Sequence, residues 1–336
     1  MNILILGANG FIGSHLSEAI LTQTNWSVYA IDLAQDKLDK CLSHERFHFF
    51  TGDMIKQKEW VTEHIKKSDV VLPLVAIATP AAYVQNPLSV FELDFEANLA
   101  VIRQCVEFNK RIIFPSTSEV YGMCPDIEFD EETSNLVTGP IHKERWIYST
   151  SKQLLDRVIY AYGKHNSLSY TLFRPFNWYG PKLDNIFNPK PGGSRVLTQF
   201  IGNILRGENI MLVGGGAQQR CFTYIDDGIS ALIKIIENKH NAAHQQIFNI
   251  GNPSENISIR ALAQSLVTLI KKYPNYAKAA SKTKLVDVDA AQYYGSGYQD
   301  VQLRVPAIHR AQQLLDWHPK VAMAEGLDKT LNFYLA

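Results

Sequence analysis

The chain lacks an excess of either charge. Its 336 residues hold 33 Lys and Arg against 33 Asp and Glu, so the formal net charge at pH 7 is +0. Nucleic acids and anionic membrane surfaces attract proteins through an excess of positive charge, and no such overall field exists here. We therefore expect no nucleic-acid partner.

Cysteine is scarce as well. The sequence has 4 cysteines, and they form no Cys-x-x-Cys pair. They are Cys41, Cys105, Cys124 and Cys221. Cysteines scattered in this way argue against a zinc site and against a disulfide framework. The sequence thus predicts reduced thiols, no metal and a cytoplasmic location.

Long apolar runs are also missing. No stretch approaches the roughly 18 apolar residues that a transmembrane helix needs. The apolar start at residues 1–6 is too short for a signal peptide and has no basic leader. We expect no membrane insertion. The hydrophobic content of 46% over this length suits two closely joined domains.

Short apolar runs alternate with helical patterns through the first half of the chain. Runs typical of buried strands cover residues 2–6, 26–33, 47–51, 69–76, 111–115 and 170–174, and helical patterns cover 12–21, 88–109 and 147–163. Alternation of this kind indicates parallel pairing with right-handed crossovers. We predict an α/β fold of the Rossmann type, a doubly wound parallel sheet.

Three glycines lie between the first apolar run and the first helical pattern, at Gly7, Gly10 and Gly13. In a dinucleotide fingerprint the first glycine allows a tight turn, the second admits the pyrophosphate and the third allows close packing of helix on strand. The helix that begins near Phe11 and Ile12 would offer free N–H groups to phosphate. A purely structural glycine turn is the alternative for this motif taken alone.

Asp32 narrows the choice of cofactor. It lies 19 positions after Gly13, at the end of the second apolar run. An acid at that point accepts a hydrogen bond from the ribose 2′-hydroxyl and repels a 2′-phosphate, so the sequence favours NAD over NADP. Asp53 is expected near the adenine amino group and Ala76 along the cofactor. For both aspartates a simple turn residue is the alternative.

The second half of the chain has a looser texture. Apolar segments at residues 222–227 and 247–251 are expected to return to the sheet, and helical patterns cover 259–272 and 325–334. We predict two interleaved domains. They are an NAD-binding Rossmann domain at 1–175, with returning segments near 221–251, and a smaller C-terminal substrate domain at 176–336.

Tyr148 and Lys152 are four residues apart in a helical pattern, which places both on one helical face. A nearby ammonium favours the phenolate and lowers a tyrosine pKa. Such a tyrosine can take the proton of a sugar hydroxyl while a hydride leaves the same carbon. A surface helix with no such role is the alternative for this pair alone.

A polar cluster follows the apolar run at 111–115. It contains Thr117, Ser118 and Glu119, directly after Ser116. Carboxyl ends of parallel strands face the ligand crevice, so a hydroxyl here can bond a reacting oxygen and the carboxylate can act as a second acid or base. A polar turn in which Ser116 starts a helix is the alternative.

Together these three motifs resemble the extended short-chain dehydrogenase/reductase family. Within it the chain is most similar to UDP-glucuronate decarboxylases, in particular to the decarboxylase domain of ArnA-type bifunctional polymyxin-resistance proteins. The similar stretches are residues 78–80, 86–88, 111–124, 145–148, 151–156, 174–178 and 297–301. Plant UDP-apiose/xylose synthases share several of them more loosely. The formyltransferase half of the bifunctional proteins is absent from this chain.

The resemblance implies a role for each site residue. Tyr148 would take the proton of the sugar 4-hydroxyl, and Lys152 would tune it. Ser118 and Glu119 would lie at the C4 to C6 end of a glucuronate, and Arg304 would meet the departing carboxylate and serve as proton donor. The remaining expected substrate residues are Ala78, Tyr83 and Thr117 around the sugar, and Asn177, Arg195, Arg220 and Tyr298 around the UDP portion. Met211 stands where the family tends to carry a basic residue.

The activity implied by the resemblance is NAD-dependent oxidative decarboxylation of UDP-glucuronate to UDP-4-keto-pentose, as in lipopolysaccharide biosynthesis. If NADH returned its hydride, the product would be UDP-xylose. A 4-epimerase or a 4,6-dehydratase of the same fold is an alternative, and a non-catalytic NAD-binding scaffold is a remote one. The helices at 88–109 and 147–163 resemble those that pair across a two-fold axis in this family, so a homodimer is expected.

Overall fold

The computed structural model describes residues 1–187 and 194–336. Its centre is a seven-stranded sheet in the order β11-β6-β5-β4-β1-β2-β3, with every pair parallel. The strands are β1 (Asn2–Leu6), β2 (Ser27–Asp32), β3 (Phe47–Thr51), β4 (Val70–Pro73), β5 (Arg111–Pro115), β6 (Tyr170–Pro175) and β11 (Gln246–Ile250). The strand order reverses between β1 and β4, which in open parallel sheets marks the ligand crevice. The predicted doubly wound fold is confirmed.

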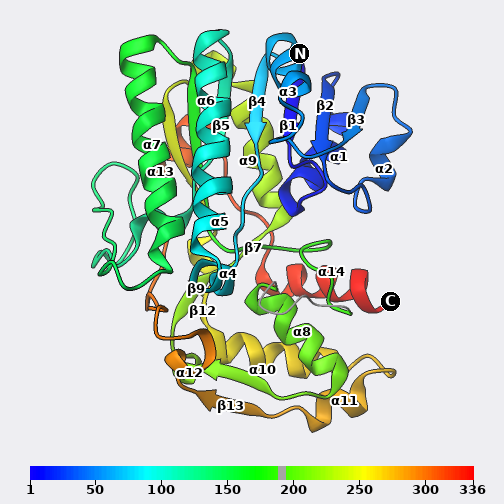
Figure 1. The fold of residues 1–336 in the computed structure, drawn as a ribbon. Coiled ribbons are helices and arrows are strands. Elements are labelled where there is room, and N and C mark those ends of the chain that lie inside the picture. Colours follow the sequence, from blue (N-terminus) through cyan, green and yellow to red (C-terminus); the bar gives the residue numbers. More distant parts are fainter. Residues whose placement is uncertain (188–193) are drawn as a thin grey trace.

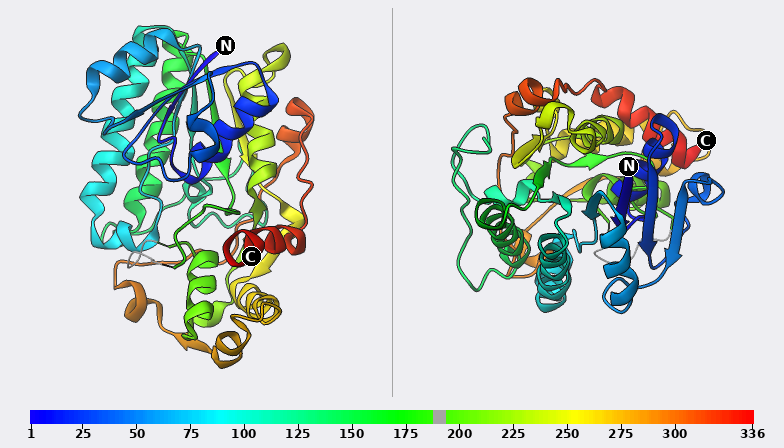
Figure 2. Two further views of the ribbon diagram at one scale, coloured as in Figure 1. Left: turned by 90° about the vertical axis from the view of Figure 1, so that its right-hand side faces the viewer. Right: turned by 90° about the horizontal axis from the view of Figure 1, so that it is seen from above.

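Helices cover both faces of the sheet and enclose two separate cores (Figures 1 and 2). One face packs against α1 (Phe11–Gln23), α9 (Ile225–Glu237) and α13 (His309–Leu315). The other packs against α3 (Lys58–Lys67), α6 (Asn98–Glu107) and α7 (Trp146–Asn166). Successive β1 residues enter opposite cores, with Ile3 in one and Leu4 in the other, because side chains alternate along a strand. Burial on both faces explains the unbroken apolar runs.

The helix predicted at 88–109 is interrupted. It comprises α5 (Pro87–Phe91), a π-helical turn (Glu92–Ala97) and α6. The side chain of Asn98 donates from Nδ2 to the carbonyls of Leu93 at 3.1 Å and Asp94 at 3.2 Å. A side chain that enters the backbone ladder in this way disrupts the regular i to i−4 pattern. The wider turn carries Asp94 into the interior, where it is fully buried.

The prediction that residues 222–227 return to the sheet is wrong. Only β10 (Thr223–Tyr224) is a strand there, and it pairs with β7 (Trp178–Tyr179) apart from the main sheet. Helix α9 begins at Ile225, and its first turn holds Asp226 and Asp227. Acidic side chains are favourable at the positive end of a helix. The return predicted at 247–251 is confirmed as β11.

Most of the remaining elements form a smaller lobe below the sheet in Figure 1. They are α8 (Val196–Arg206), β8 (Ile210–Val213), β9 (Gln219–Cys221), β12 (Asn256–Ser258), α10 (Ile259–Ile270), α11 (Ala277–Lys282), β13 (Leu285–Val288) and α12 (Ala290–Tyr294). Helix α14 (Met323–Leu335) crosses between the lobe and the sheet, and α2 (Asp39–Leu42) and α4 (Pro80–Gln85) are short connections. Within 1–187 and 194–336, no helix has both the length and the apolar character needed to cross a bilayer.

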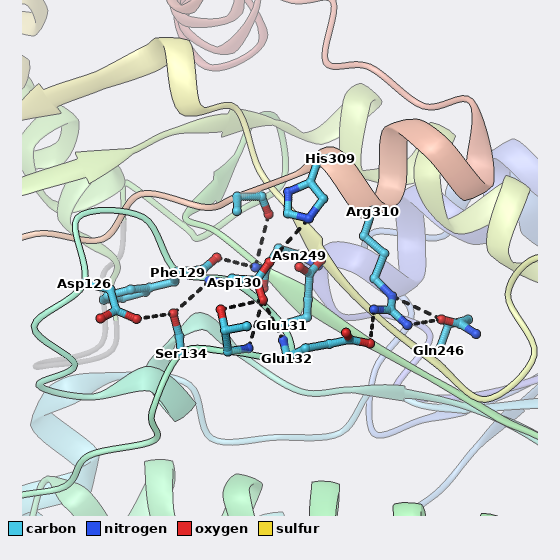
Figure 3. A network of polar contacts seen from close by, with 12 residues as sticks. Asp126, Phe129, Asp130, Glu131, Glu132, Ser134, Gln246, Asn249, His309 and Arg310 are labelled. Atoms are coloured by element: carbon cyan, nitrogen blue, oxygen red, sulfur yellow. Dashed lines mark hydrogen bonds and ion pairs between the residues drawn. The ribbon is translucent and has the colours of Figure 1, made fainter.

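The long segment between β5 and α7 is fastened to the sheet edge by a polar network (Figure 3). Glu131 Oε1 accepts from the backbone N–H of Asn249 in β11 at 2.7 Å, and Asn249 Nδ2 donates to Phe129 O at 2.7 Å. Arg310 of α13 pairs with Glu132. Because the segment leads from the end of β5 to the start of α7, these contacts help to fix both of its ends.

Candidate active site

A cavity of about 420 Å³ opens at the carboxyl ends of the central strands and extends to the smaller lobe. Most predicted site residues line it: Gly7, Gly10, Phe11, Ile12, Gly13, Ala76, Ala78, Tyr83, Thr117, Ser118, Glu119, Tyr148, Lys152, Asn177, Arg195, Arg220, Tyr298 and Arg304. Asp32 and Asp53 lie outside this lining. The fold therefore joins motifs that are almost 300 positions apart in the sequence, since Gly7 and Arg304 border one space.

The glycine turn leaves room for a phosphate group. Gly7 has a φ of +91°, which only glycine adopts readily, and a Cβ on Gly13 would lie 2.4 Å from the Gly7 carbonyl oxygen. Helix α1 starts directly after Gly10, and no side chain caps it. Its first N–H groups remain available to an anion, as expected of a pyrophosphate site.

Asp32 and Asp53 lie at neighbouring strand ends, since β2 pairs with β3 up to Asp32 and Thr51. The carboxylate of Asp32 accepts from the N–H of Asn9 at 2.8 Å and of Leu33 at 2.7 Å. Burial raises the pKa of Asp32, and the backbone bonds oppose that rise. A second negative group beside this carboxylate would add to the cost of burying its charge. These residues fit a dinucleotide with a free ribose 2′-hydroxyl, which is NAD.

Tyr148 and Lys152 both face the cavity from α7, but they do not interact as the sequence predicts. The Tyr148 ring stacks on Tyr83, with centroids 4.6 Å apart and planes at 5°. Lys152 Nζ donates to the Pro115 carbonyl at 3.1 Å and lies 3.8 Å from Asp94 Oδ1. Burial, followed by the charge of Asp94, raises the pKa of Tyr148. The expected lowering by Lys152 is therefore wrong for this structure.

A hydroxyl from the end of β5 reaches the side chain of Tyr148. The Thr117 side chain hydrogen-bonds Tyr148 and opposes the rise in its pKa. Thr117 Oγ1 also accepts from the Glu119 N–H at 3.2 Å and caps a 3₁₀ turn. Ser116 donates to Asp156 at 2.7 Å and Ser118 lines the cavity. A helical turn therefore does start here, as the alternative interpretation of the cluster held, but Thr117 rather than Ser116 caps it. The same residues also line the cavity.

Glu119 is held between two buried arginines. Its carboxylate pairs with Arg145 through one oxygen and with Arg304 through the other. Burial alone would raise the pKa of Glu119, but Arg145 and Arg304 outweigh it and lower the pKa to about 2. Burial works against the charge of Arg304, yet Glu119 raises its pKa above the usual value. Glu119 is thus a fixed anion rather than the acid or base expected from the sequence.

A third arginine completes this cluster. Arg220 Nη2 lies 2.7 Å from Asp300 Oδ1. Burial, with Arg304 adding to it, lowers the pKa of Arg220 to about 10. Three arginines against two carboxylates leave one positive charge without an anionic partner within the cluster.

Two of the residues predicted to hold the nucleotide, Arg195 and Asn177, are less tightly enclosed than the arginine cluster. Arg195 Nη1 donates to the Leu183 carbonyl at 3.0 Å and pairs with Asp184, and 38% of its side chain is exposed. Asn177 Nδ2 donates to the Cys221 carbonyl at 3.1 Å. Met211 lines the cavity and is 38% exposed, so an apolar side chain occupies this part of the wall.

Sequence reasoning missed three members of the site, Arg145, Asp94 and Asp300. Arg145 offered one signal, because it directly precedes α7 and a cation at a helix N-terminus opposes the helix dipole. Asp94 interrupts an apolar stretch on a predicted helix, which marks a buried polar role. Asp300 offered no signal outside the similar stretch at 297–301.

In the part of the chain that the structure describes, no His, Cys, Asp or Glu cluster could hold a metal ion.

Comparisons with known proteins agree with this geometry. The structure of the PbgP3 protein from Burkholderia pseudomallei is 54% identical over 99% of this chain and 96% of its own, with a TM-score of 0.91. UDP-glucuronic acid 4-epimerase from Bacillus cereus, solved with NAD and a fluorinated UDP-glucuronic acid, is 23% identical over 99% and 98% of the two chains, with a TM-score of 0.80.

The dTDP-glucose 4,6-dehydratase DesIV from Streptomyces venezuelae, solved with NAD, is 22% identical over 99% and 97% of the two chains, with a TM-score of 0.82. At this identity the last two structures show a shared fold. A family model described as the NAD dependent epimerase/dehydratase family matches residues 3–251. The chain therefore belongs to the NAD dependent epimerase/dehydratase family, within the extended short-chain dehydrogenase/reductases, and NAD is its cofactor.

Proposed function

We propose that this enzyme oxidises C4 of UDP-glucuronate and then releases the C6 carboxylate as CO2, which leaves UDP-4-keto-pentose. The observation that carries the proposal is the buried arginine cluster around Glu119, in the same cavity as Tyr148. Its one positive charge in excess matches the one negative charge of a uronate. A neutral hexose would leave that charge uncompensated in a buried site, which is unfavourable.

Oxidation at C4 requires a base at the sugar hydroxyl. Tyr148, as the phenolate, takes that proton, and Thr117 hydrogen-bonds the same oxygen. NAD, when bound, accepts the hydride from C4. Lys152 supplies a positive charge to the buried site, and Gly7 to Gly13 hold the cofactor phosphates.

Oxidation makes the next step possible. With a ketone at C4, the C6 carboxylate belongs to a β-keto acid, so the electrons of the broken C5–C6 bond move to the C4 oxygen. Tyr148, now protonated, and Ser118 donate hydrogen bonds where that charge develops. Arg304 first holds the carboxylate and then, while it stays charged, assists the protonation of C5 by solvent, and Glu119 keeps Arg304 and Arg145 in place.

The nucleotide part of the substrate is assigned to the part of the cavity that begins at Arg220, whose charge Asp300 balances. Arg195, Arg220 and Asn177 bind the UDP portion, with the ring of Tyr298 beside them. Ala78 and Tyr83 border the sugar. Met211 supplies an apolar contact where the similar enzymes tend to use a basic residue, so one ionic contact to the nucleotide is replaced.

The geometry disfavours a 4,6-dehydratase. That reaction needs a carboxylic acid able to exchange a proton during loss of water across C5 and C6. Glu119, with a pKa of about 2 and both oxygens paired, stays ionised near neutral pH. A non-catalytic scaffold is disfavoured as well, because Tyr148, Lys152 and Thr117 are all present in one cavity.

The test is to incubate the protein with NAD and UDP-glucuronate and to identify the product by mass spectrometry. We expect a product lighter by the mass of one CO2 and two hydrogen atoms, with NADH formed. A product of unchanged mass would indicate an epimerase, and loss of water would indicate a dehydratase. Loss of CO2 without net NADH would indicate UDP-xylose or apiose/xylose synthesis. Either of the first two results contradicts the proposal.

We also propose a homodimer that pairs α7 with the helical segment at 88–109, which runs from α5 through the π-helical turn into α6. These are the helices predicted to meet across a two-fold axis. Leu88, just before the π-helical turn, is 72% exposed, and Leu154 of α7 is 46% exposed. Apolar side chains left in water on adjacent helices favour a covering surface. Light scattering at micromolar concentration should give twice the mass of the chain, and a purely monomeric protein would contradict this.

A further inference from the structure

Asp94 is a buried carboxylate to which the proposed reaction assigns no role. It is 0% exposed, and the π-helical turn points it toward α7. Oδ2 accepts from the N–H of Ile77 at 2.9 Å. Oδ1 has no hydrogen-bond partner among the described residues and faces Lys152 Nζ at 3.8 Å. Burying an ionisable group with one oxygen unsatisfied is costly, so this arrangement calls for a reason.

Lys152 is equally enclosed. It is 1% exposed, and its ammonium has the Pro115 carbonyl at 3.1 Å and the ring of Phe114 at 4.7 Å as its other neighbours. Asp94 is therefore the nearest anion to the lysine that the Tyr-x-x-x-Lys motif places in the site. A buried ammonium keeps its charge only when an anion stays close.

The other charged and titratable groups around this pair are accounted for. Asp156, one turn further along α7, also acts on Lys152, but it is paired with Arg174 at 3.1 Å. Tyr83 of α4 and Tyr148 of α7 both feel the charges of Asp94 and Glu119, while Arg145 acts in the opposite direction on Tyr83 and Arg195 on Tyr148. Lys152 is the one charged group that acts on Asp94 within the described residues.

We propose that Asp94 is a positioning residue that keeps Lys152 charged and shares that charge with Tyr148, so that the three groups titrate as one unit. The inference rests on the proposed role of Tyr148 as base. While Asp94 is ionised, Lys152 is balanced and the phenol keeps its proton. When Tyr148 loses that proton to become an anion, the same ammonium balances the phenolate, and Asp94 is then the group that takes up a proton.

The local titration behaviour supports this coupling. Burial raises the pKa of Asp94 to about 6, with Lys152 opposing the rise. Burial lowers the pKa of Lys152, and Asp94 opposes that fall. Asp94 is the largest charged contribution to the raised pKa of Tyr148. Asp94 therefore shifts the proton affinity of both Lys152 and Tyr148.

The backbone around Asp94 is fixed on the cofactor side of the cavity. Asn98 Nδ2 donates to the carbonyls of Val75 at 3.3 Å and Asp94 at 3.2 Å. Ile77, which donates to Asp94, follows Ala76 on the cavity wall. The carboxylate thus connects the wall beside the cofactor to the lysine beside the tyrosine.

The experiment compares pH–rate profiles of the holoenzyme on UDP-glucuronate for Asp94→Asn and Asn98→Ser. Removing the charge of Asp94 lowers the proton affinity of both Tyr148 and Lys152, so both limbs should move to lower pH by on the order of one unit. Asn98→Ser loosens the same turn without changing a charge, so it should lower kcat and leave both limbs in place. The proposal would be overturned if the limbs of the pH–rate profile did not move in Asp94→Asn, or if they moved equally in Asn98→Ser.

Two further readouts do not depend on turnover. In the first, the ultraviolet absorbance of each protein is followed against pH, and the curve of the same protein carrying Tyr148→Phe is subtracted. The difference reports the Tyr148 phenolate, which should appear at lower pH in Asp94→Asn than in the parent. Unfolding by denaturant should show that Asp94→Asn restores stability lost in Lys152→Met, because the double variant has no unpaired charge. A double variant no more stable than Lys152→Met contradicts the pairing even if Asp94→Asn alone folds poorly. If these readouts hold while no CO2 forms, the proposed function fails and the coupling stands.

Discussion

Two buried carboxylates, Glu119 in the wall of the cavity and Asp94 behind it, behave in opposite ways. Glu119 meets Arg145 and Arg304, and its pKa falls to about 2. Asp94 has one cation, Lys152, at 3.8 Å, and its pKa rises to about 6. Burial raises the pKa of both. The difference shows that the number and closeness of cations decide which effect wins.

This contrast divides the cavity by task. Around Glu119 the charges are fixed at every pH near neutral, which suits recognition of a charged substrate. Around Asp94 a proton can move near neutral pH, which suits a base and its partners.

The largest expected effect is at the base. Tyr148→Phe keeps the ring and its stacking on Tyr83 but removes the group that takes the proton, so oxidation should fall by about 10²- to 10⁴-fold while substrate binding survives. The rate of NADH formation in a stopped-flow experiment measures the oxidation, and calorimetry measures substrate binding. Tyr83→Phe removes a hydroxyl from the same ring pair and should have a much smaller effect on the rate. Equal losses in both variants would contradict the assignment.

At Glu119 the main expected effect is on the stability of the fold in acid. Because folding lowers the pKa of Glu119 from an ordinary 4.5 to about 2, its contribution is complete above pH 4.5 and is lost as the pH falls toward 2. That contribution is about 3 kcal/mol. Glu119→Gln should therefore be less stable at neutral pH and should lose less stability between pH 4.5 and 2. Denaturant unfolding at several pH values measures both, and parallel profiles for the variant and the parent would show that Glu119 is not held as described.

Asp94 should show the opposite pH dependence. Its folded pKa of about 6 lies above the ordinary 3.8, so ionised Asp94 destabilises the fold above pH 6 and that cost is relieved as the pH falls toward 3.8. In Asp94→Asn this rise in stability on mild acidification should disappear. The same unfolding series measures it, and a rise that persists in the variant must come from another group.

A smaller catalytic effect is expected at Arg304. Arg304→Met removes the charge that holds the substrate carboxylate, so CO2 release should slow by about 10- to 100-fold, the value of one charged hydrogen-bonded contact. Nucleotide binding should change less, and Arg304→Lys should recover part of the rate. Wild-type rates of both NADH formation and CO2 release in Arg304→Met would show that the wrong arginine was assigned.

The smallest expected effect concerns a third carboxylate, Asp32. Backbone N–H groups hold it, and no cation among residues 1–187 and 194–336 is in direct contact with it. Asp32→Ser should relax the preference for NAD over NADP by roughly tenfold, the value of one hydrogen bond to a charged group. Rates with both cofactors on the same substrate measure it. Equal use of NAD and NADP by the unmodified protein would refute the assignment.

Much of this arrangement was predictable from the sequence, because parallel strands bring their carboxyl ends to one edge. The bounds of β1, β3 and β5 match the predicted runs, and Tyr148 and Arg304 reach the same cavity as expected. The π-helical turn was not predictable, because it depends on where the Asn98 side chain lies in the folded core. The rise in the pKa of Tyr148 was not predictable for a similar reason, because the fold alone brings Asp94 close to Lys152.

The most direct test follows NADH and CO2 together, with UDP-glucuronate and UDP-glucose as alternative substrates. We predict one CO2 for each NADH from UDP-glucuronate, and little turnover of UDP-glucose because it brings no negative charge to Arg145 and Arg304. NADH formation or C4 inversion with UDP-glucose at a comparable rate, or a UDP-glucuronate product that keeps its carboxylate, would contradict a decarboxylase that recognises a uronate.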